Sequence, residues 1–93
     1  MNLYNEIQKQ FPKMATFFSP KEMKTFLSCD YKKLYLYHFG FGTWIRNNIL
    51  QNGTPLFSAF LSCDISEKDD MSFLMIQLFY IYLRPNYIKR FPK

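Results

Sequence analysis

Apolar residues recur three or four positions apart along most of the chain, which is the spacing of one face of an α-helix. Over residues 2–11 the apolar positions are Leu3, Ile7 and Phe11, and Pro12 is expected to close this helix. Four later segments carry similar spacing and are separated by short polar breaks. The pattern therefore favours helices throughout and gives little indication of strands.

Residues 19–29 begin with a helix-start signature. Ser19 is a natural N-cap, Pro20 suits the first helical position, and Glu22 completes a capping box. The buried stripe predicted for this helix is Met23, Phe26 and Leu27.

A third helix is predicted from Tyr31 to about Leu50, with Asp30 as its N-cap. Gly40 and Gly42 interrupt it, each at a cost of about 1 kcal/mol relative to Ala. Close packing explains such glycines, because a neighbouring backbone or ring can approach only where side chains are absent. The apolar positions are Leu34, Tyr37, Phe41, Ile45 and Ile49.

The remaining helices follow the break "QNGTP", in which Gly53 can cap the preceding helix, Thr54 can cap the next and Pro55 can start it. After that short helix, the acidic segment 64–70 leads into a last helix that is apolar on all sides and is expected to end at Pro85. Such a helix is either central in a fold or in contact with a partner.

The predicted fold is an all-α, compact bundle-like domain of about five helices. Residues 1–93 form a single helical domain, and residues 85–93 are its basic C-terminal tail. No signal peptide or membrane-spanning run is visible, so we expect a cytoplasmic protein with reduced cysteines and no contact with a membrane.

Candidate chemistry is sparse. His38 is the sole imidazole, and neither cysteine lies in a nucleophile context, so we expect a protein without catalytic residues. Two Cys and one His fall short of a zinc site, and the acidic residues do not have EF-hand spacing, so neither a metal nor a cofactor is expected. Gly40 and Gly42 lack the third glycine of a dinucleotide fingerprint, because Ile45 occupies its place.

The net charge of +5 is compatible with an acidic partner or nucleic acid. The alternative function we consider is therefore an RNA-binding accessory protein. Tyr35 and Trp44 would stack bases, although no RNA-binding motif is visible. The basic residues proposed for this surface are Lys32, Lys33, Arg46, Lys89 and Arg90.

Two stretches, "LYLYHFGFGTWIRNNIL" and "DDMSFLMIQLFYIYL", together resemble the DUF6794 family of small bacterial domains. The resemblance covers roughly residues 20–84 and brings no established activity. It implies a structural lock, in which Arg46 or Asn47 hydrogen-bonds Asp69 or Asp70 at the start of the last helix. The matching residues are His38, Phe39, Gly40, Gly42, Arg46, Asn47, Asp69, Asp70, Met71 and Ser72.

We expect a small non-catalytic binding protein that acts by occupying another macromolecule. An inhibitor or immunity-type protein, directed at a toxin, nuclease or phage-defence effector, fits the small size and the excess of aromatic residues. Self-association is left open. The candidate contact residues are Tyr35, Phe39, Trp44 and the aromatic residues of the last helix.

Overall fold

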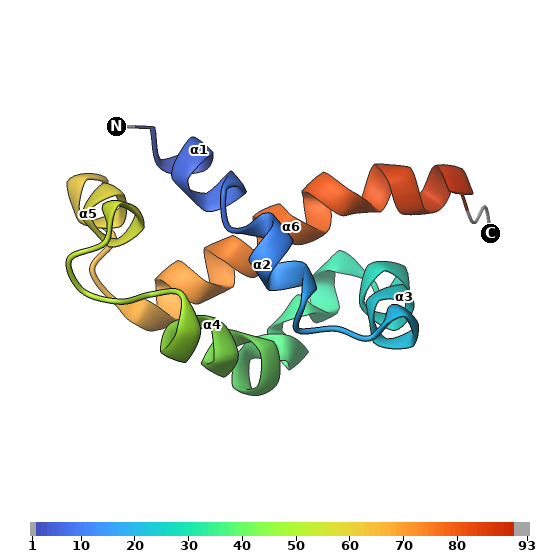
Figure 1. Ribbon diagram of the computed structural model, residues 1–93. Helices are drawn as coiled ribbons and strands as arrows, with labels where there is room; N and C mark the ends of the chain where they lie inside the picture. The colour runs from blue at the N-terminus through green and yellow to red at the C-terminus, as the bar shows by residue number, and fades with distance from the viewer. Residues whose placement is uncertain (1, 91–93) are drawn as a thin grey trace.

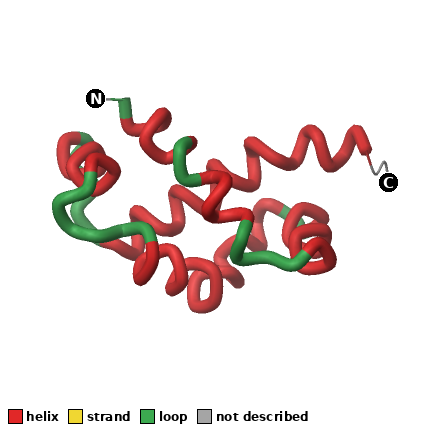
Figure 2. Tube along the Cα trace, in the orientation of Figure 1, coloured by secondary structure: helices red, strands yellow, loops and turns green. Residues whose placement is uncertain are grey.

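A computed structural model describes the backbone of residues 2–90 and the side chains of residues 2–86. The described chain is helical with no strand, which confirms the predicted all-α fold (Figures 1 and 2). The α-helices are α1 (Leu3–Gln8), α2 (Phe11–Ala15), α3 (Pro20–Ser28), α4 (Thr43–Asn48), α5 (Pro55–Ser62) and α6 (Lys68–Arg90). Between α3 and α4 lie η1 (Tyr31–Tyr37), a 3₁₀ helix, and η2 (His38–Gly42), a π-helix.

The helix α6 runs through the whole molecule and the other helices pack around it (Figure 1). In this view α5 lies at one end, α3 lies toward the other, and α4 faces α1 and α2 across α6. The overall extents are 41 × 25 × 23 Å, and α6 ends on the side of the molecule opposite to α5 (Figure 1). None of the described helices is sufficiently long and apolar to cross a membrane.

The expected end of the first helix at Pro12 is wrong. The helix α1 is capped by the Asn2 side chain and already ends at Gln8, and Pro12 lies in the first turn of the next helix, α2. A proline is tolerated there because the first turn of a helix leaves its N–H groups without intrahelical partners.

The predicted caps of α3 and α5 are confirmed. Ser19 Oγ accepts from the Glu22 N–H at 3.1 Å and Glu22 Oε1 accepts from the Ser19 N–H at 2.9 Å, which completes the capping box. The Ser19 backbone N–H, and to a lesser degree the Ser19 side chain, hydrogen-bond the Glu22 carboxylate and lower its pKa. Thr54 Oγ1 accepts from the Phe57 N–H at 3.2 Å to begin α5.

The segment 31–50 is not the single continuous helix that we predicted. Asp30 does cap its start, but the first seven residues form the 3₁₀ helix η1, the next five form the π-helix η2, and only Thr43–Asn48 are α-helical. The 3₁₀ helix η1 has three residues per turn, so Leu34 and Tyr37, which are three residues apart, lie on the same face. The wide turn that follows buries Phe41 and leaves Phe39 exposed.

The helix α5 ends in a Schellman motif. The Ile65 N–H donates to the Phe60 carbonyl at 3.0 Å, and the Asp64 N–H donates to the Leu61 carbonyl at 3.1 Å. Asp64 occupies the left-handed position of this motif, with φ of 61°. Asp64 therefore belongs to the end of α5, and α6 begins only at Lys68. Gly53, with φ of 84°, lies in the turn before α5, beyond the end of α4.

Substitution of Asp64 by glycine should stabilise the protein. Glycine adopts the left-handed conformation without a side-chain penalty, and we expect the free energy of unfolding to rise by about 0.5 kcal/mol. Valine at the same position should lower it by about 1–2 kcal/mol, because its branched side chain clashes with the backbone there. Urea unfolding of both variants measures the difference, and equal stabilities would contradict the assignment.

Pro85 does not end the last helix, which continues to Arg90. Proline within a helix removes one hydrogen-bond donor and leaves the carbonyl four residues earlier without its partner. Both Pro85 and Ile81, the residue with that carbonyl, are exposed, so water can satisfy the group. Residues 85–90 of the predicted basic tail therefore belong to α6. Residues 91–93 lie outside the described part of the chain.

The apolar character of α6 on all sides is explained mainly by its central position. Five of its apolar residues are almost fully buried: Met71, Met75, Ile76, Phe79 and Tyr80. The Phe79 ring lies 6.0 Å from the Phe26 ring and 5.8 Å from the Phe41 ring, so it joins α3 to η2 in one core. The outer face keeps Ile81 and Tyr82 about half exposed, at 50% and 46%.

A second polar tie joins α6 to the end of α3. The Cys29 carbonyl accepts from Tyr80 Oη at 2.6 Å and from Arg84 Nη1 at 2.9 Å. The Arg84 guanidinium also lies over the Tyr80 ring, 5.1 Å from its centroid. The unpaired carbonyl at a helix end is thereby satisfied by two side chains of one neighbouring helix.

Removal of the Tyr80 hydroxyl tests this tie. We expect Tyr80→Phe to lower the free energy of unfolding by about 1 kcal/mol, because Arg84 still satisfies the carbonyl. Tyr82→Phe is the matched control, since the half-exposed Tyr82 hydroxyl makes no hydrogen bond to the described residues. Equal urea midpoints for the two variants would show that the buried hydroxyl contributes nothing.

Candidate functional site

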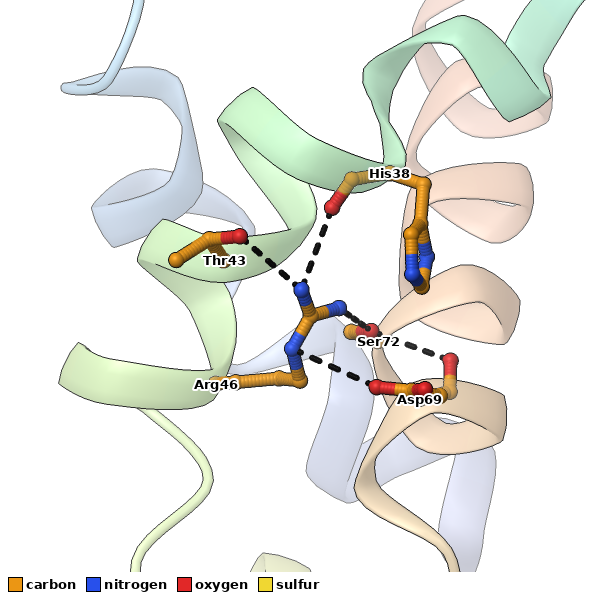
Figure 3. Close-up of polar contacts among 5 residues, drawn as sticks. All are labelled: His38, Thr43, Arg46, Asp69 and Ser72. Carbon is orange, nitrogen blue, oxygen red and sulfur yellow. Dashed lines mark hydrogen bonds and ion pairs between the residues drawn. The ribbon is translucent and has the colours of Figure 1, made fainter.

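The guanidinium of Arg46 connects three elements at the centre of the predicted motif (Figure 3). Nη1 donates to Ser72 Oγ at 2.8 Å, and Nη2 donates to Thr43 Oγ1 at 2.9 Å and to the His38 carbonyl at 3.2 Å. Nε lies 3.5 Å from Asp69 Oδ1, one of the pairings that the resemblance implied. Ser72 in turn donates to the Asp69 carbonyl at 3.0 Å.

This network holds the π turn of η2 against the beginning of α6. The Arg46 side chain is only 16% exposed, so its charge has to be satisfied within the protein. One nitrogen binds the backbone where the wide turn begins, at His38, while another binds the buried hydroxyl of Ser72. We call these five residues, His38, Thr43, Arg46, Asp69 and Ser72, the arginine network.

Gly42 provides the space that the guanidinium occupies. A Cβ at this position would lie 3.0 Å from Arg46 Nη1, 3.5 Å from the Tyr37 carbonyl oxygen and 3.7 Å from Ile76 Cδ1. The close-packing explanation therefore holds at Gly42. It is wrong at Gly40, which is exposed and where a Cβ would meet no atom within 4 Å.

The other residues assigned to the lock have different positions. His38 contributes its carbonyl, whereas its partly buried imidazole packs edge-on against the Phe39 ring, 5.0 Å away. Asn47 is exposed and makes no contact with Asp69 or Asp70, and Asp70 is also exposed. The sequence had not indicated Thr43 as a partner of Arg46, and Ser72 had been noted only as part of the family pattern.

Next to the arginine network lies an open hollow of about 390 Å³. Residues of η1 and η2 form one side of it, and residues of the first turns of α6 form the other. We refer to it as the Phe39 hollow. Its lining consists of Tyr35, His38, Phe39, Asp69, Asp70 and Phe73.

Two of the most exposed large apolar residues of the described chain line this hollow: Phe39 is 84% exposed and Tyr35 is 61% exposed. Leu36, which is 63% exposed, follows Tyr35 in the chain but does not line the hollow. Trp44 differs from them, because its ring packs 5.5 Å from Phe17 and 6.3 Å from Phe41 and is only partly accessible. Of the predicted contact residues, the structure thus brings Tyr35 and Phe39 together and sets Trp44 against the core.

The predicted basic surface is only partly visible. Lys32 and Lys33 are exposed on η1, close in sequence to Tyr35. Lys89 and Arg90 belong to the last turns of α6, and their side chains lie outside the described residues. Arg46 is committed to the arginine network and is not available to phosphate.

The Cys29 thiol is not activated as a nucleophile. Burial raises the pKa of the Cys29 thiol, an effect that the nearby Arg84 only partly opposes, so this thiol is protonated at neutral pH. Burial also raises the pKa of Tyr37. Cys63 is exposed, and both cysteines are free.

Among the described residues, no group of three or more His, Cys, Asp or Glu is arranged to hold a metal ion.

These features define a small all-α domain in which a central helix is tied to a π turn through one arginine. Residues 5–83 match the family described as Domain of unknown function (DUF6794), and the chain belongs to this family. The match begins before the motif that suggested it and includes most of α1 and all of α2. No curated protein and no solved structure matches the chain.

Proposed function

We propose that this domain is a small binding protein that acts by occupying another macromolecule, and that the Phe39 hollow and the adjoining Leu36 form its contact surface. The observation that carries the proposal is the 84% exposure of Phe39 in one hollow with Tyr35, which is 61% exposed. Large apolar side chains that share one surface of a small domain are typical of protein–protein contacts.

The arginine network supports this proposal because it holds the backbone next to Phe39. Phe39 lies within the π turn, and Arg46 binds the carbonyl of the preceding residue, His38. A contact residue on an immobilised backbone loses less conformational entropy on binding than one on a mobile loop. The hydrogen bond to His38 should reduce this cost for Phe39.

Within this proposal, the partner class that we favour is a protein target of an inhibitor, such as a toxin, a nuclease or a defence effector. A small rigid domain with an exposed aromatic surface is suited to blocking a site on a larger protein. RNA is the less favoured partner. Lys32 and Lys33 lie near Tyr35, but Asp69 and Asp70 line the same hollow and would repel phosphate.

The test is affinity purification of the tagged protein from its native host, with Phe39→Ser compared with Leu61→Ser. Leu61 is 47% exposed on α5, away from the hollow, and is the matched control. We expect Phe39→Ser to lower recovery of the partner at least about tenfold, as for loss of an aromatic interface anchor. Leu61→Ser should recover it fully.

Four results would contradict the proposal. The wild-type protein could elute alone as a monomer, or the two variants could recover the partner equally. Loss of the partner on RNase treatment, with binding that weakens steeply as salt rises, would identify RNA instead. Recovery of a second copy of this chain alone would assign the surface to self-association.

A further inference from the structure

The Phe39 hollow combines two kinds of side chain on opposite sides. Tyr35 and Phe39, from the 3₁₀ and π segments, offer aromatic rings that are 61% and 84% exposed. Asp69 and Asp70, from the first turn of α6, offer carboxylates. A volume of about 390 Å³ is large enough for one long side chain together with part of its backbone.

The carboxylates retain free capacity to accept hydrogen bonds. Asp69 uses Oδ1 for its 3.5 Å contact with Arg46, and its side chain is still 69% exposed. Asp70 forms no hydrogen bond or ion pair with any of the described residues. The nearest cation in sequence, Lys68, lies over the Phe57 ring, 5.8 Å from its centroid. Asp70 therefore brings to the hollow a negative charge that forms no ion pair with a described residue, on a chain whose net charge is +5.

The carboxylates of the hollow favour a positively charged ligand, and the neighbouring aromatic rings determine which kind of cation fits best. A guanidinium group is planar, stacks on aromatic rings and donates to carboxylates in a fork of N–H groups at the same time. An ammonium group is more strongly hydrated and makes no planar stack. Resting on the proposed function, we propose that the Phe39 hollow receives an arginine side chain of the protein partner, stacked against Phe39 and Tyr35 and paired with Asp70 and Asp69.

The experiment is an NMR titration of the full chain with the peptide acetyl-Ala-Arg-Ala-amide. Its matched control is the same peptide with citrulline, which keeps the shape of arginine and lacks the charge. We expect saturable shifts confined to the backbone amides of residues 35–39 and 69–73, with a Kd on the order of 1–10 mM for so small a ligand. The citrulline and lysine peptides should bind about threefold to fivefold more weakly.

Two variants locate the charge contact. Asp70→Asn should lower the affinity for the arginine peptide at least about twofold, toward that of the citrulline peptide, because Asp70 lines the hollow and forms no ion pair with a described residue. Glu67→Gln removes the same charge from an exposed residue near the start of α6 outside the hollow, and should leave the affinity unchanged. Asp69 is left intact because it belongs to the arginine network.

Equal binding of the arginine and citrulline peptides, or of the arginine and lysine peptides, would overturn the inference. Shifts at other residues, no shifts at all, or shifts at these residues with an oligouridylate would do the same. The outcome is separable from that of the proposed function. If the arginine peptide does not bind but Phe39→Ser still lowers recovery of the partner, the proposed contact surface is retained and only the proposed arginine ligand is wrong.

Discussion

Replacement of Arg46 by alanine is expected to lower the free energy of unfolding by about 2–4 kcal/mol, which is much of the stability of a domain of this size. The substitution removes three hydrogen bonds and the contact with Asp69. It also leaves the His38 carbonyl and the buried Ser72 hydroxyl without their donor. The cost thus exceeds that of an exposed ion pair, which is commonly below about 1 kcal/mol.

Urea unfolding followed by circular dichroism measures this loss, with Asn47→Ala as the control on the adjacent exposed position. Arg46→Lys should recover only part of the stability, because one ammonium group cannot reach the four acceptors that the guanidinium spans. An unchanged midpoint for Arg46→Ala would show that the arginine network does not stabilise the fold.

The second large effect is expected at Gly42. Leucine at this position would displace the Arg46 guanidinium and press on Ile76, and we expect a loss of about 3 kcal/mol from these two causes. Alanine at Gly40 is the matched control. Its Cβ meets open space, so the gain in helix propensity should stabilise the protein by up to about 1 kcal/mol.

A double-mutant cycle identifies the cause of the Gly42 effect. In the Arg46→Ala background the space next to position 42 is empty, so Gly42→Ala should become stabilising by about 0.5–1 kcal/mol. With Arg46 present the same change has to shift Nη1, which is 3.0 Å away, and the gain should be lost. Additive effects of the two substitutions would rule out the steric coupling.

Sequence reasoning was most successful where the signal is local. Ser19, Asp30 and Thr54 cap helices as expected, because a cap depends only on the side chain and on N–H groups two or three residues later. Pro12 and Pro85 were both predicted to end a helix, but Pro12 lies in the first turn of α2 and Pro85 lies inside α6. The ring excludes a helical hydrogen bond but does not determine whether a helix begins there or continues with a solvated carbonyl.

The interruption of residues 31–50 could not be predicted from periodicity. Apolar spacing of three and four is shared by the 3₁₀, π and α segments, so the pattern alone does not separate them. In the structure the wide turn is held by Arg46, which donates to the His38 carbonyl eight residues earlier and to Ser72 on another helix. Such an interaction depends on tertiary packing.

The candidate site was partly visible in the sequence for a similar reason. A charged residue such as Arg46 requires a partner, and the family pattern directed attention to Asp69. A hydroxyl group such as that of Thr43 finds hydrogen-bond partners in many environments, so its presence in the sequence does not predict a particular partner. The Cys29 carbonyl, bound by Tyr80 and Arg84, has no sequence signature at all, because every residue carries a carbonyl.

The central position of α6 has a consequence for biosynthesis. The two long-range polar contacts described above, Arg46 to Ser72 and Tyr80 to Cys29, both end on this helix and span 26 and 51 residues of the chain. The five preceding α-helices have at most nine residues each, too few to be stable alone in water. Ribosome-bound chains that stop before residue 68 should thus remain protease-sensitive, and the domain becomes resistant only once its last helix has left the ribosome.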